Sequence, residues 1–228
     1  GTDGTTFQFA VNENNWLGRG VKLESALNLS TEQISGNILV NNPNYNFSDK
    51  SLKAGVDISS TDRSSSSGFK SSKTGFVLGT GFEQYEDLFF SPEITVAFEE
   101  IEVDSSASTA IKNMEGDFFN IDFTYGLTLD KRDQSWKPTE GYKTTFIQAL
   151  PIIQDSSAIE NGLFISTYHD FTDDIIGSLK FHVRAINGLD DDVRLSKRLY
   201  ISRKSLRGFN TSRVGPKDGD DWIGGNYT

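Results

Sequence analysis

Long stretches of the chain alternate strictly between apolar and polar residues. In Phe118–Asp130 every odd-numbered residue is aromatic or aliphatic, and every even-numbered residue after the first is polar or glycine. Ile175–Asn187 repeats the pattern, and Lys180, His182 and Arg184 occupy consecutive positions of its polar face. Successive side chains of a β-strand point to opposite faces, so a period of two predicts strands with one apolar and one polar face.

The same period recurs more weakly along the chain and predicts about ten successive strands. They are Thr5–Val11, Gly20–Ser30, Gln33–Asn41, Ser51–Asp62, Lys73–Phe82, Leu88–Asp104, Phe118–Asp130, Gly141–Ile152, Ile159–Phe171 and Ile175–Asn187. Many exceed the five or six residues usual in a soluble sandwich, and tilted strands of about 9–11 residues can span a bilayer. Periodicity alone leaves open whether the apolar face meets lipid or a protein core. With no helical periodicity, the pattern favours an all-β, antiparallel up-and-down transmembrane β-barrel.

Aromatic residues gather in every second predicted connection. They are Trp16, Tyr45, Phe47, Tyr85 and Trp136. The intervening connections are mostly small and polar. Alternate connections of an up-and-down barrel lie at the same end, so we predict an aromatic girdle at one rim, where the ring is apolar and its N–H or O–H stays wet. The basic run on the polar face of Ile175–Asn187 predicts a water-filled interior, because a dry core would leave these charges unpaired.

Composition narrows the classes of protein further. The chain has 228 residues and a formal net charge of −10, with 32 acidic against 22 basic side chains. Nucleic-acid affinity depends on neutralising phosphates, so this balance argues against a nucleic-acid partner. Cysteine is absent from these residues, which excludes disulfides and thiolate metal sites within them. No run of 18 apolar residues occurs, so no transmembrane helix is predicted.

No segment carries a recognisable catalytic or metal-binding arrangement. His169 and His182 lie in different predicted strands, without acidic or cysteine residues at ligand spacing. Gly79–Gly81 follows a strand but leads into no helix, which argues against a phosphate-binding loop. We therefore predict that the chain is not an enzyme and uses neither a metal nor a cofactor.

Three connections stand out instead. Two are turns, Asn14–Gly20 and Asp130–Tyr142, and the third is a loop of roughly 35 residues, Leu189–Ile223. A connection that long is normally functional or disordered. Residues expected to shape the three connections are Trp16, Gly18, Gly20, Trp136, Pro138, Gly141, Gly215, Pro216, Gly224 and Gly225. The functional motif expected in the loop is Arg207-Gly208-Phe209.

Four motifs follow one another along the chain. They read NNWLGRG at Asn14–Gly20, VNNPNY at Val40–Tyr45, LDKRDQSWKPTEGY at Leu129–Tyr142, and SLRGF…VGPKDG…GGN between Ser205 and Asn226. In this order and spacing they resemble the BamA family of outer-membrane β-barrel assembly factors of Gram-negative bacteria, and the resemblance covers essentially the whole chain. It implies an incomplete barrel, with strands two through eleven of sixteen and the twelfth beginning at Gly224–Thr228. It also implies a periplasmic aromatic rim, Leu189–Ile223 as the sixth extracellular loop, and periplasmic repeat domains outside these residues.

The resemblance also implies a function. Proteins of this family receive unfolded outer-membrane proteins from the periplasm and fold and insert them into the outer membrane without ATP. Expected partners are these substrates, outer-membrane lipids and accessory assembly lipoproteins, which bind the periplasmic domains, and no nucleic acid. The sixth loop would fold back into the lumen, where Arg207, beside Gly208 and Phe209, would pair with acidic groups of later strands. Two departures stand out: Ser202–Lys204 replaces a frequent Gly-Gly pair, and the loop is short between Gly219 and Gly224.

Three other functions remain open at this point. A translocation-assembly or two-partner secretion pore of the same superfamily would have a basic lumen and different periplasmic domains. A passive porin would have a constriction loop with no need of the Arg207-Gly208-Phe209 motif. A soluble β-sandwich binding module would have a dry, apolar inner face, which the run Lys180, His182 and Arg184 argues against.

Overall fold

The computed structural model describes residues 6–31, 33–64, 68–105, 107, 109–155, 157–172, 174–190, 192–194, 197–201, 206, 208–209, 214–218 and 221–228. Within them, ten strands form one sheet in chain order, each antiparallel to the next. The strands are β1 Phe7–Trp16, β2 Val21–Leu29, β3 Gln33–Asn42, β4 Ser51–Arg63, β5 Phe69–Tyr85, β6 Leu88–Val103, β7 Gly116–Asp130, β8 Gly141–Gln154, β9 Ala158–Thr172 and β10 Ile175–Gly188. The predicted all-β, up-and-down architecture is therefore confirmed.

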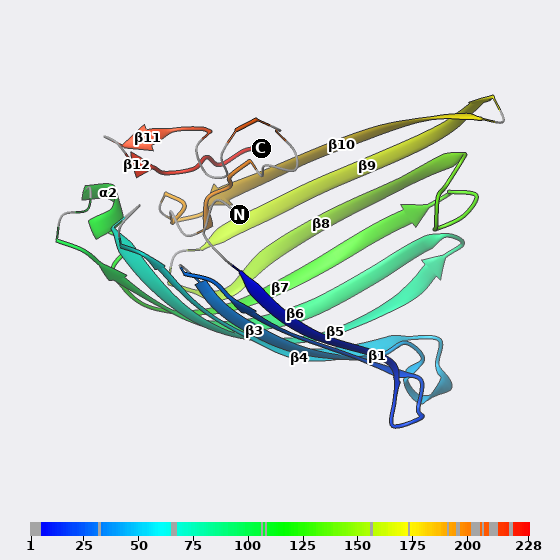
Figure 1. The fold of residues 1–228 in the computed structure, drawn as a ribbon, viewed down its shortest axis with the longest axis horizontal. Coiled ribbons are helices and arrows are strands. Elements are labelled where there is room, and N and C mark those ends of the chain that lie inside the picture. Colours follow the sequence, from blue (N-terminus) through cyan, green and yellow to red (C-terminus); the bar gives the residue numbers. More distant parts are fainter. Residues whose placement is uncertain are drawn as a thin grey trace.

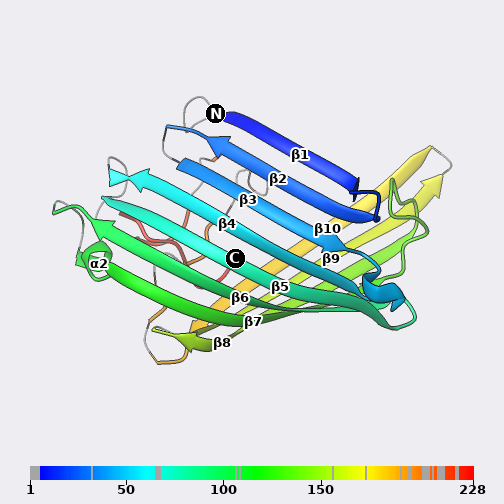
Figure 2. The same ribbon diagram turned by 90° about the horizontal axis from the view of Figure 1, so that it is seen from below.

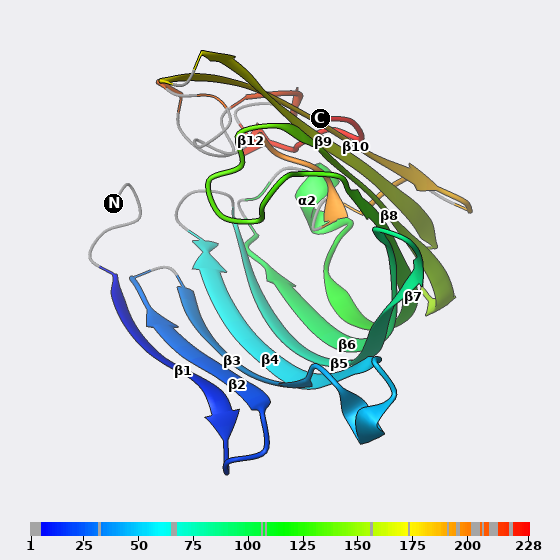
Figure 3. The same ribbon diagram turned by 90° about the vertical axis from the view of Figure 1, so that its right-hand side faces the viewer.

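The sheet curls into an open trough and does not close. Figure 3 shows the curl end-on, with β1 and β10 at its two edges, and Figure 2 shows the strands in chain order across the convex side. In the described residues β1 pairs only with β2, and no pairing joins β1 to β10. The segment after β10 returns into the concave side, where it contains a small hairpin of β11 Lys217–Asp218 and β12 Asp221–Trp222 (Figure 1).

Two strands extend well beyond their predicted ranges, and others differ from theirs by one or two residues. β1 continues to Trp16 through a register shift between Glu13 and Trp16, so it includes part of the predicted turn. β5 begins at Phe69 rather than Lys73, because the polar stretch before Lys73 still pairs with β4 on one side and β6 on the other. Such polar positions alternate weakly in hydrophobicity, although their backbones complete the ladder.

The convex face is apolar. Cross-strand register aligns Phe9 with Leu27 and then, through Gly36, with Ile58, so residues of one face continue from strand to strand. Exposed apolar side chains of this face include Phe7, Phe9, Leu27, Ile34, Ile38, Ile58, Phe76, Leu78, Ile94, Phe98, Leu179 and Phe181. An apolar outer surface of this extent fits the lipid-facing side of a transmembrane barrel.

One polar row crosses this apolar face. The Tyr125 hydroxyl donates to Gln148 Oε1 at 2.9 Å, and Gln148 Nε2 donates to Asn161 Oδ1 at 2.6 Å. The three residues are cross-strand neighbours on β7, β8 and β9. Because hydrocarbon offers no hydrogen-bond partners, these mutual bonds lower the cost of placing polar groups there.

The connections that carry the aromatic residues lie at one end of the trough, here called the hairpin end. The connections β1–β2, β3–β4, β5–β6 and β7–β8 share that end (Figure 1), as the alternation of aromatic connections predicted. The β3–β4 connection contains the 3₁₀ turn η1 Tyr45–Phe47, where Asn46 and Phe47 both have positive φ. Its Phe47 is 94% exposed, so this rim presents apolar rings to its surroundings.

The opposite end holds a short helix that the sequence did not predict. α2, Thr109–Lys112, lies between β6 and β7, and Ile111 and Met114 are buried there. A single helical turn is too short to produce a recognisable helical period, which explains the prediction of a plain polar connection. No helix in the described part of the chain is long and apolar enough to cross a membrane.

Candidate functional site

The concave face of the sheet is polar and charged. Lys53 and Glu93 form an ion pair at 2.5 Å, and Arg184 Nε donates to Glu160 Oε1 at 2.9 Å. These side chains lie on the polar faces of β4, β6, β9 and β10, opposite the apolar convex surface. This concave face, called the wall below, therefore carries charges of both signs, some of them paired, and suits contact with water or a polar segment.

The first described part of the loop after β10 packs against this wall. It comprises residues 192–194 and 197–201 and is called the first limb below. Val193 and Leu199 form a buried cluster with Ala158 of β9 and Ile186 of β10. All four side chains are less than 9% exposed, although most of the wall is polar. This apolar contact seats Val193 and Leu199 on the concave side of β9 and β10.

A basic side chain of the same limb reaches farther, to β7. The Arg194 guanidinium carbon lies 3.8 Å from the centre of the Phe118 ring, and Nη2 lies 3.4 Å from Asn120 Oδ1. Arg194 is 9% exposed and Asn120 4% exposed. Sequence reasoning missed Arg194, because its partners lie about 75 positions away and no motif marks it.

The neighbouring Arg198 makes contacts of a different kind. Its Nε donates to the Val193 carbonyl oxygen at 3.1 Å, and Nη2 donates to Asp192 Oδ2 at 2.6 Å. Both partners belong to the loop itself. Arg198 therefore stabilises the conformation of the first limb through contacts within the loop, whereas Arg194 joins the first limb to the wall.

The returning limb pairs with the sheet. Residues 226–228 run antiparallel to β10: Arg184 and Thr228 exchange two backbone hydrogen bonds at 2.9 and 3.0 Å, and Ile186 N donates to Asn226 O at 2.8 Å. Gly225 exchanges backbone bonds with Leu199 at 2.8 and 3.0 Å, so the two limbs are also joined to each other. The loop is thus tied to the sheet at both of its ends.

Between the loop and the wall lies a cavity of about 780 Å³. Loop residues Tyr200, Ile201 and Leu206 line one side, and His182 and Arg184 of β10 lie on the other. Leu206 immediately precedes the predicted motif, so the chain reaches this cavity as it enters Arg207-Gly208-Phe209. The cavity has a mixed polar and apolar lining.

The predicted functional motif is described only in part. Arg207 lies outside the described residues. Gly208 has φ 90°, and Phe209 is 54% exposed. Farther along, Gly215 and Gly224 also have positive φ, Pro216 accepts a backbone hydrogen bond from Ile223 at 3.1 Å, and Gly225 forms the bridge to Leu199.

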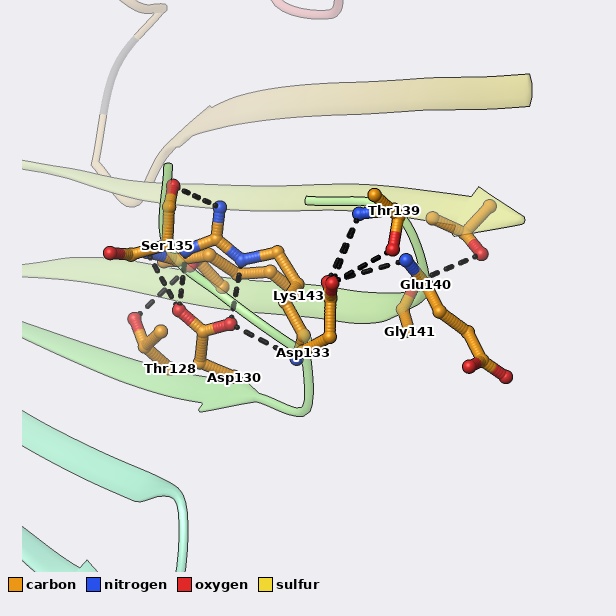
Figure 4. A network of polar contacts seen from close by, with 11 residues as sticks. Thr128, Asp130, Asp133, Ser135, Thr139, Glu140, Gly141 and Lys143 are labelled. Atoms are coloured by element: carbon orange, nitrogen blue, oxygen red, sulfur yellow. Dashed lines mark hydrogen bonds and ion pairs between the residues drawn. The ribbon is translucent and has the colours of Figure 1, made fainter. Parts of the chain in front are cut away.

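The β7–β8 turn is a second ordered feature, at the hairpin end. Arg132 grips Asp130 with two hydrogen bonds of 2.7 Å, from Nε to Oδ1 and from Nη2 to Oδ2 (Figure 4). Lys143 adds an ion pair to Asp130 at 3.5 Å. Hydrogen bonding to Asp130 raises the pKa of Arg132 above its ordinary value. This two-pronged contact fixes the start of the turn.

The far side of the same turn closes on Asp133. Its carboxylate accepts bonds from the Thr139 hydroxyl at 2.9 Å and from the backbone N–H of Thr139 and Glu140 (Figure 4). Partial removal of water raises the pKa of Asp133, but these hydrogen bonds outweigh that effect and lower the pKa below its ordinary value. The turn is therefore held by side chains rather than by a regular hairpin geometry.

Trp136, Pro138 and Gly141 occupy this turn as predicted from the sequence. Trp136 is 78% exposed at its tip, and Pro138 is half-buried. Gly141 has φ 93°, and a Cβ there would collide with the Lys131 carbonyl oxygen. Glycine is required at 141 for both reasons.

The β1–β2 turn places Trp16, Gly18 and Gly20 together. Gly18 N donates to the Asn15 carbonyl oxygen at 2.9 Å, and Gly20 N donates to Asn15 Oδ1 at 2.6 Å. Both glycines have positive φ, near 69° and 66°.

Among the described residues, no group of three or more His, Cys, Asp or Glu could hold a metal ion.

Comparisons with known proteins agree on one superfamily. The sequence profile of the Omp85 superfamily domain matches residues 15–228. Among solved structures, the crystal structure of BamA from Haemophilus ducreyi lacking POTRA domains 1-3 matches with a TM-score of 0.83 and 18% sequence identity. The match covers 99% of this chain and 49% of that one, so this chain spans about half the length of its structural relative.

Proposed function

The chain belongs to the Omp85 superfamily, and from this premise we propose that it forms part of the barrel domain of a factor that folds and inserts β-barrel proteins into the outer membrane. Its location is the bacterial outer membrane. The proposed role needs no catalytic chemistry. Its proposed substrates are unfolded outer-membrane proteins, and its proposed partners are outer-membrane lipids and accessory lipoproteins that bind outside these residues.

One observation carries the proposal beyond the superfamily. The loop that bears Arg207-Gly208-Phe209 is seated on the concave wall by Val193, Leu199 and Arg194. A loop seated in the interior by buried contacts narrows the path along it, whereas the constriction loop of a passive porin has to leave a permanently open channel. An assembly factor, by contrast, works at the strands and the surrounding bilayer and does not need a wide permanent lumen.

The character of the wall bears on the secretion-pore alternative. Such a pore is expected to have a basic lumen, whereas the concave face here carries acidic as well as basic side chains, and two of its basic residues are paired, Lys53 with Glu93 and Arg184 with Glu160. A surface that carries both signs of charge gives no strong overall basic field. This balance supports the assembly factor over the secretion pore.

The test replaces Arg207 in the full-length protein that contains this chain. In cells that depend on the variant, Arg207→Ala is expected to lower the yield of folded reporter outer-membrane proteins, measured by heat-modifiable electrophoretic mobility. Arg207→Lys is expected to restore little, because lysine lacks the planar fork that binds a carboxylate at two points. Arg19→Ala, in the exposed β1–β2 turn, removes the same charge elsewhere and should leave assembly intact.

Two results would count against the proposal. Normal reporter assembly with Arg207→Ala, at normal protein levels, would remove the role given to the loop. A large, steady open-channel current from the unmodified protein in planar bilayers would favour a porin instead.

A further inference from the structure

Arg194 is an unusual side chain for a loop that enters a polar lumen. It is one of two polar residues in the described part of the chain that are buried to nine-tenths or more, together with Asn120. Its Nε and Nη1 have no hydrogen-bond partner among the residues that the structure describes, although both are shielded from water. A buried cation with unmet donors is costly, so its position requires a compensating interaction.

The compensation comes from an aromatic face and a ring of negative charge. The guanidinium carbon stands 3.8 Å from the centre of the Phe118 ring, close enough for a cation–π contact. Glu99, Asp155 and Asp122 also attract the Arg194 charge. These carboxylates lie on or next to β6, β7 and β8, so the field they create is fixed to the wall and not to the loop.

The three carboxylates do not form close ion pairs with Arg194. Among the described residues no ion pair within 4.0 Å involves Arg194, and two of the carboxylates have partners of their own. Asp155 accepts a hydrogen bond from Phe119 N at 3.2 Å, and Asp122 accepts one from Gln154 Nε2. Among the described residues, the cation is held by its hydrogen bond to Asn120, by the contact with the Phe118 ring and by the attraction of these carboxylates, and not by a two-point hydrogen bond to one carboxylate.

We propose that Arg194 is a positioning residue that anchors the first limb of loop 189–223 to the β6–β7 wall. This anchor is separate from the predicted contact of Arg207, which lies 13 positions further along the chain. With Val193 and Leu199 seated on β9 and β10, the start of the loop is attached to the sheet at two places, near its β10 edge and at β7. The start of the loop therefore defines where the segment bearing Arg207-Gly208-Phe209 enters the lumen. The anchoring stands on contacts alone, and only its consequence for assembly rests on the proposed function.

The chain offers a direct readout of docking. Because these 228 residues contain no cysteine, the pair Val193→Cys and Ala158→Cys introduces the only thiols of this segment. Both positions belong to one buried cluster, so a short thiol cross-linker should join them when the limb is docked. Other cysteines of the full-length protein would be replaced by serine. Cross-linking yield in outer-membrane vesicles then measures the docked fraction.

Arg194→Ala in this background is expected to lower the cross-linking yield by about fivefold or more, and to raise the mean current in planar bilayers. Arg194→Lys keeps the charge without the planar face and should fall between Ala and Arg. Arg198→Ala is the matched control, because in the described part of the chain Arg198 bonds only within the loop, to Asp192 and the Val193 carbonyl. It should leave both readouts near those of the parent.

Phe118→Leu tests the same contact from the wall, and it remains informative if Arg194→Ala fails to reach the membrane. It should reproduce the undocking, and adding Arg194→Ala to it should lower the yield no further. An unchanged cross-linking yield with Arg194→Ala or Phe118→Leu would overturn the anchor. An equal loss with Arg198→Ala would do so as well. Undocking with normal reporter assembly would leave the anchor in place and remove the loop from the proposed function.

Discussion

Lys53 Nζ lies 2.5 Å from Glu93 Oε2 although the two residues stand on β4 and β6, with β5 between them. The register aligns Lys53 with Gly79 and Gly79 with Glu93. A Cβ at position 79 would lie 2.9 Å from Glu93 Cβ and 3.1 Å from Lys53 Cε. The missing side chain therefore creates the space in which the ion pair bridges two strands.

Gly79→Ala should weaken the barrel. The added methyl group has to displace Glu93 or Lys53, and overpacking of this kind costs about 1–3 kcal/mol. Gly126→Ala is the control, because its Cβ would meet nothing closer than Ser91 Cβ at 3.9 Å. Urea unfolding of the full-length protein in detergent should show a lower midpoint for the first variant only. Equal midpoints would mean that the ion pair adjusts without cost.

The two basic residues of the β7–β8 turn should differ in their contribution. Arg132 binds Asp130 at two points with side chains 13% and 24% exposed, whereas Lys131 meets Asp87 with side chains 41% and 43% exposed. Arg132→Ala should cost about 1 kcal/mol, a value reduced by solvent screening, and Arg132→Lys should recover part of it. Lys131→Ala should leave the urea midpoint unchanged. A larger loss at Lys131 would reverse this ranking.

The fold was predictable from sequence because apolar and polar residues alternate along the strands of the sheet. The strict alternation around Phe119 and Asn120 predicts a strand with one face toward lipid and the other in polar contacts. The alternation is weak where both faces of a strand are polar, as before Lys73. There the predicted start of β5 was wrong. Pairing with neighbouring backbones, rather than side-chain pattern, extends β5 to Phe69.

The site was predictable only in its local parts. The turn glycines, such as Gly18 and Gly141, follow from backbone geometry that few other residues adopt. Arg194 and Phe118 are in contact although 76 positions separate them in the sequence, and no sequence motif near either residue predicts the contact. Arg207, chosen by resemblance, lies outside the described residues, so its role stays a prediction.

Acid should loosen the β7–β8 turn within a defined window. The pKa of Asp133 is lowered in the folded turn from its ordinary value of 3.8, so its hydrogen bonds stabilise the turn fully above that value. That contribution is lost as pH falls through the lower, folded pKa. Emission from Trp136, as the single tryptophan, should therefore change in this acid range. In Asp133→Asn this contribution should disappear and leave the change that comes from Asp130, whose pKa is lowered to about 2 by its hydrogen bond to Arg132. A transition centred above pH 3.8 would contradict the sign of the pKa shift.

The aromatic rim should lie at the membrane interface. Trp16 and Trp136 are 39% and 78% exposed in turns at the hairpin end, and the indole ring prefers the headgroup region because its N–H stays hydrated. Trp222 differs, since it lies in the loop on the concave side, with Lys217 Nζ 4.3 Å from its ring centre. Single-tryptophan variants report on each position by fluorescence in vesicles that contain brominated lipids.

Quenching by bromine should sort the three tryptophans. Bromine placed near the headgroups should quench Trp16 and Trp136 more than bromine deep in the acyl chains, because only shallow bromine reaches the interface. Trp222 should be quenched weakly by both lipids, since the sheet separates it from the bilayer. Deep quenching of Trp136 would place the turn inside the hydrocarbon, where the unpaired charge of Lys137 at its tip would be costly, and the assignment of this end as an interfacial rim would then be wrong.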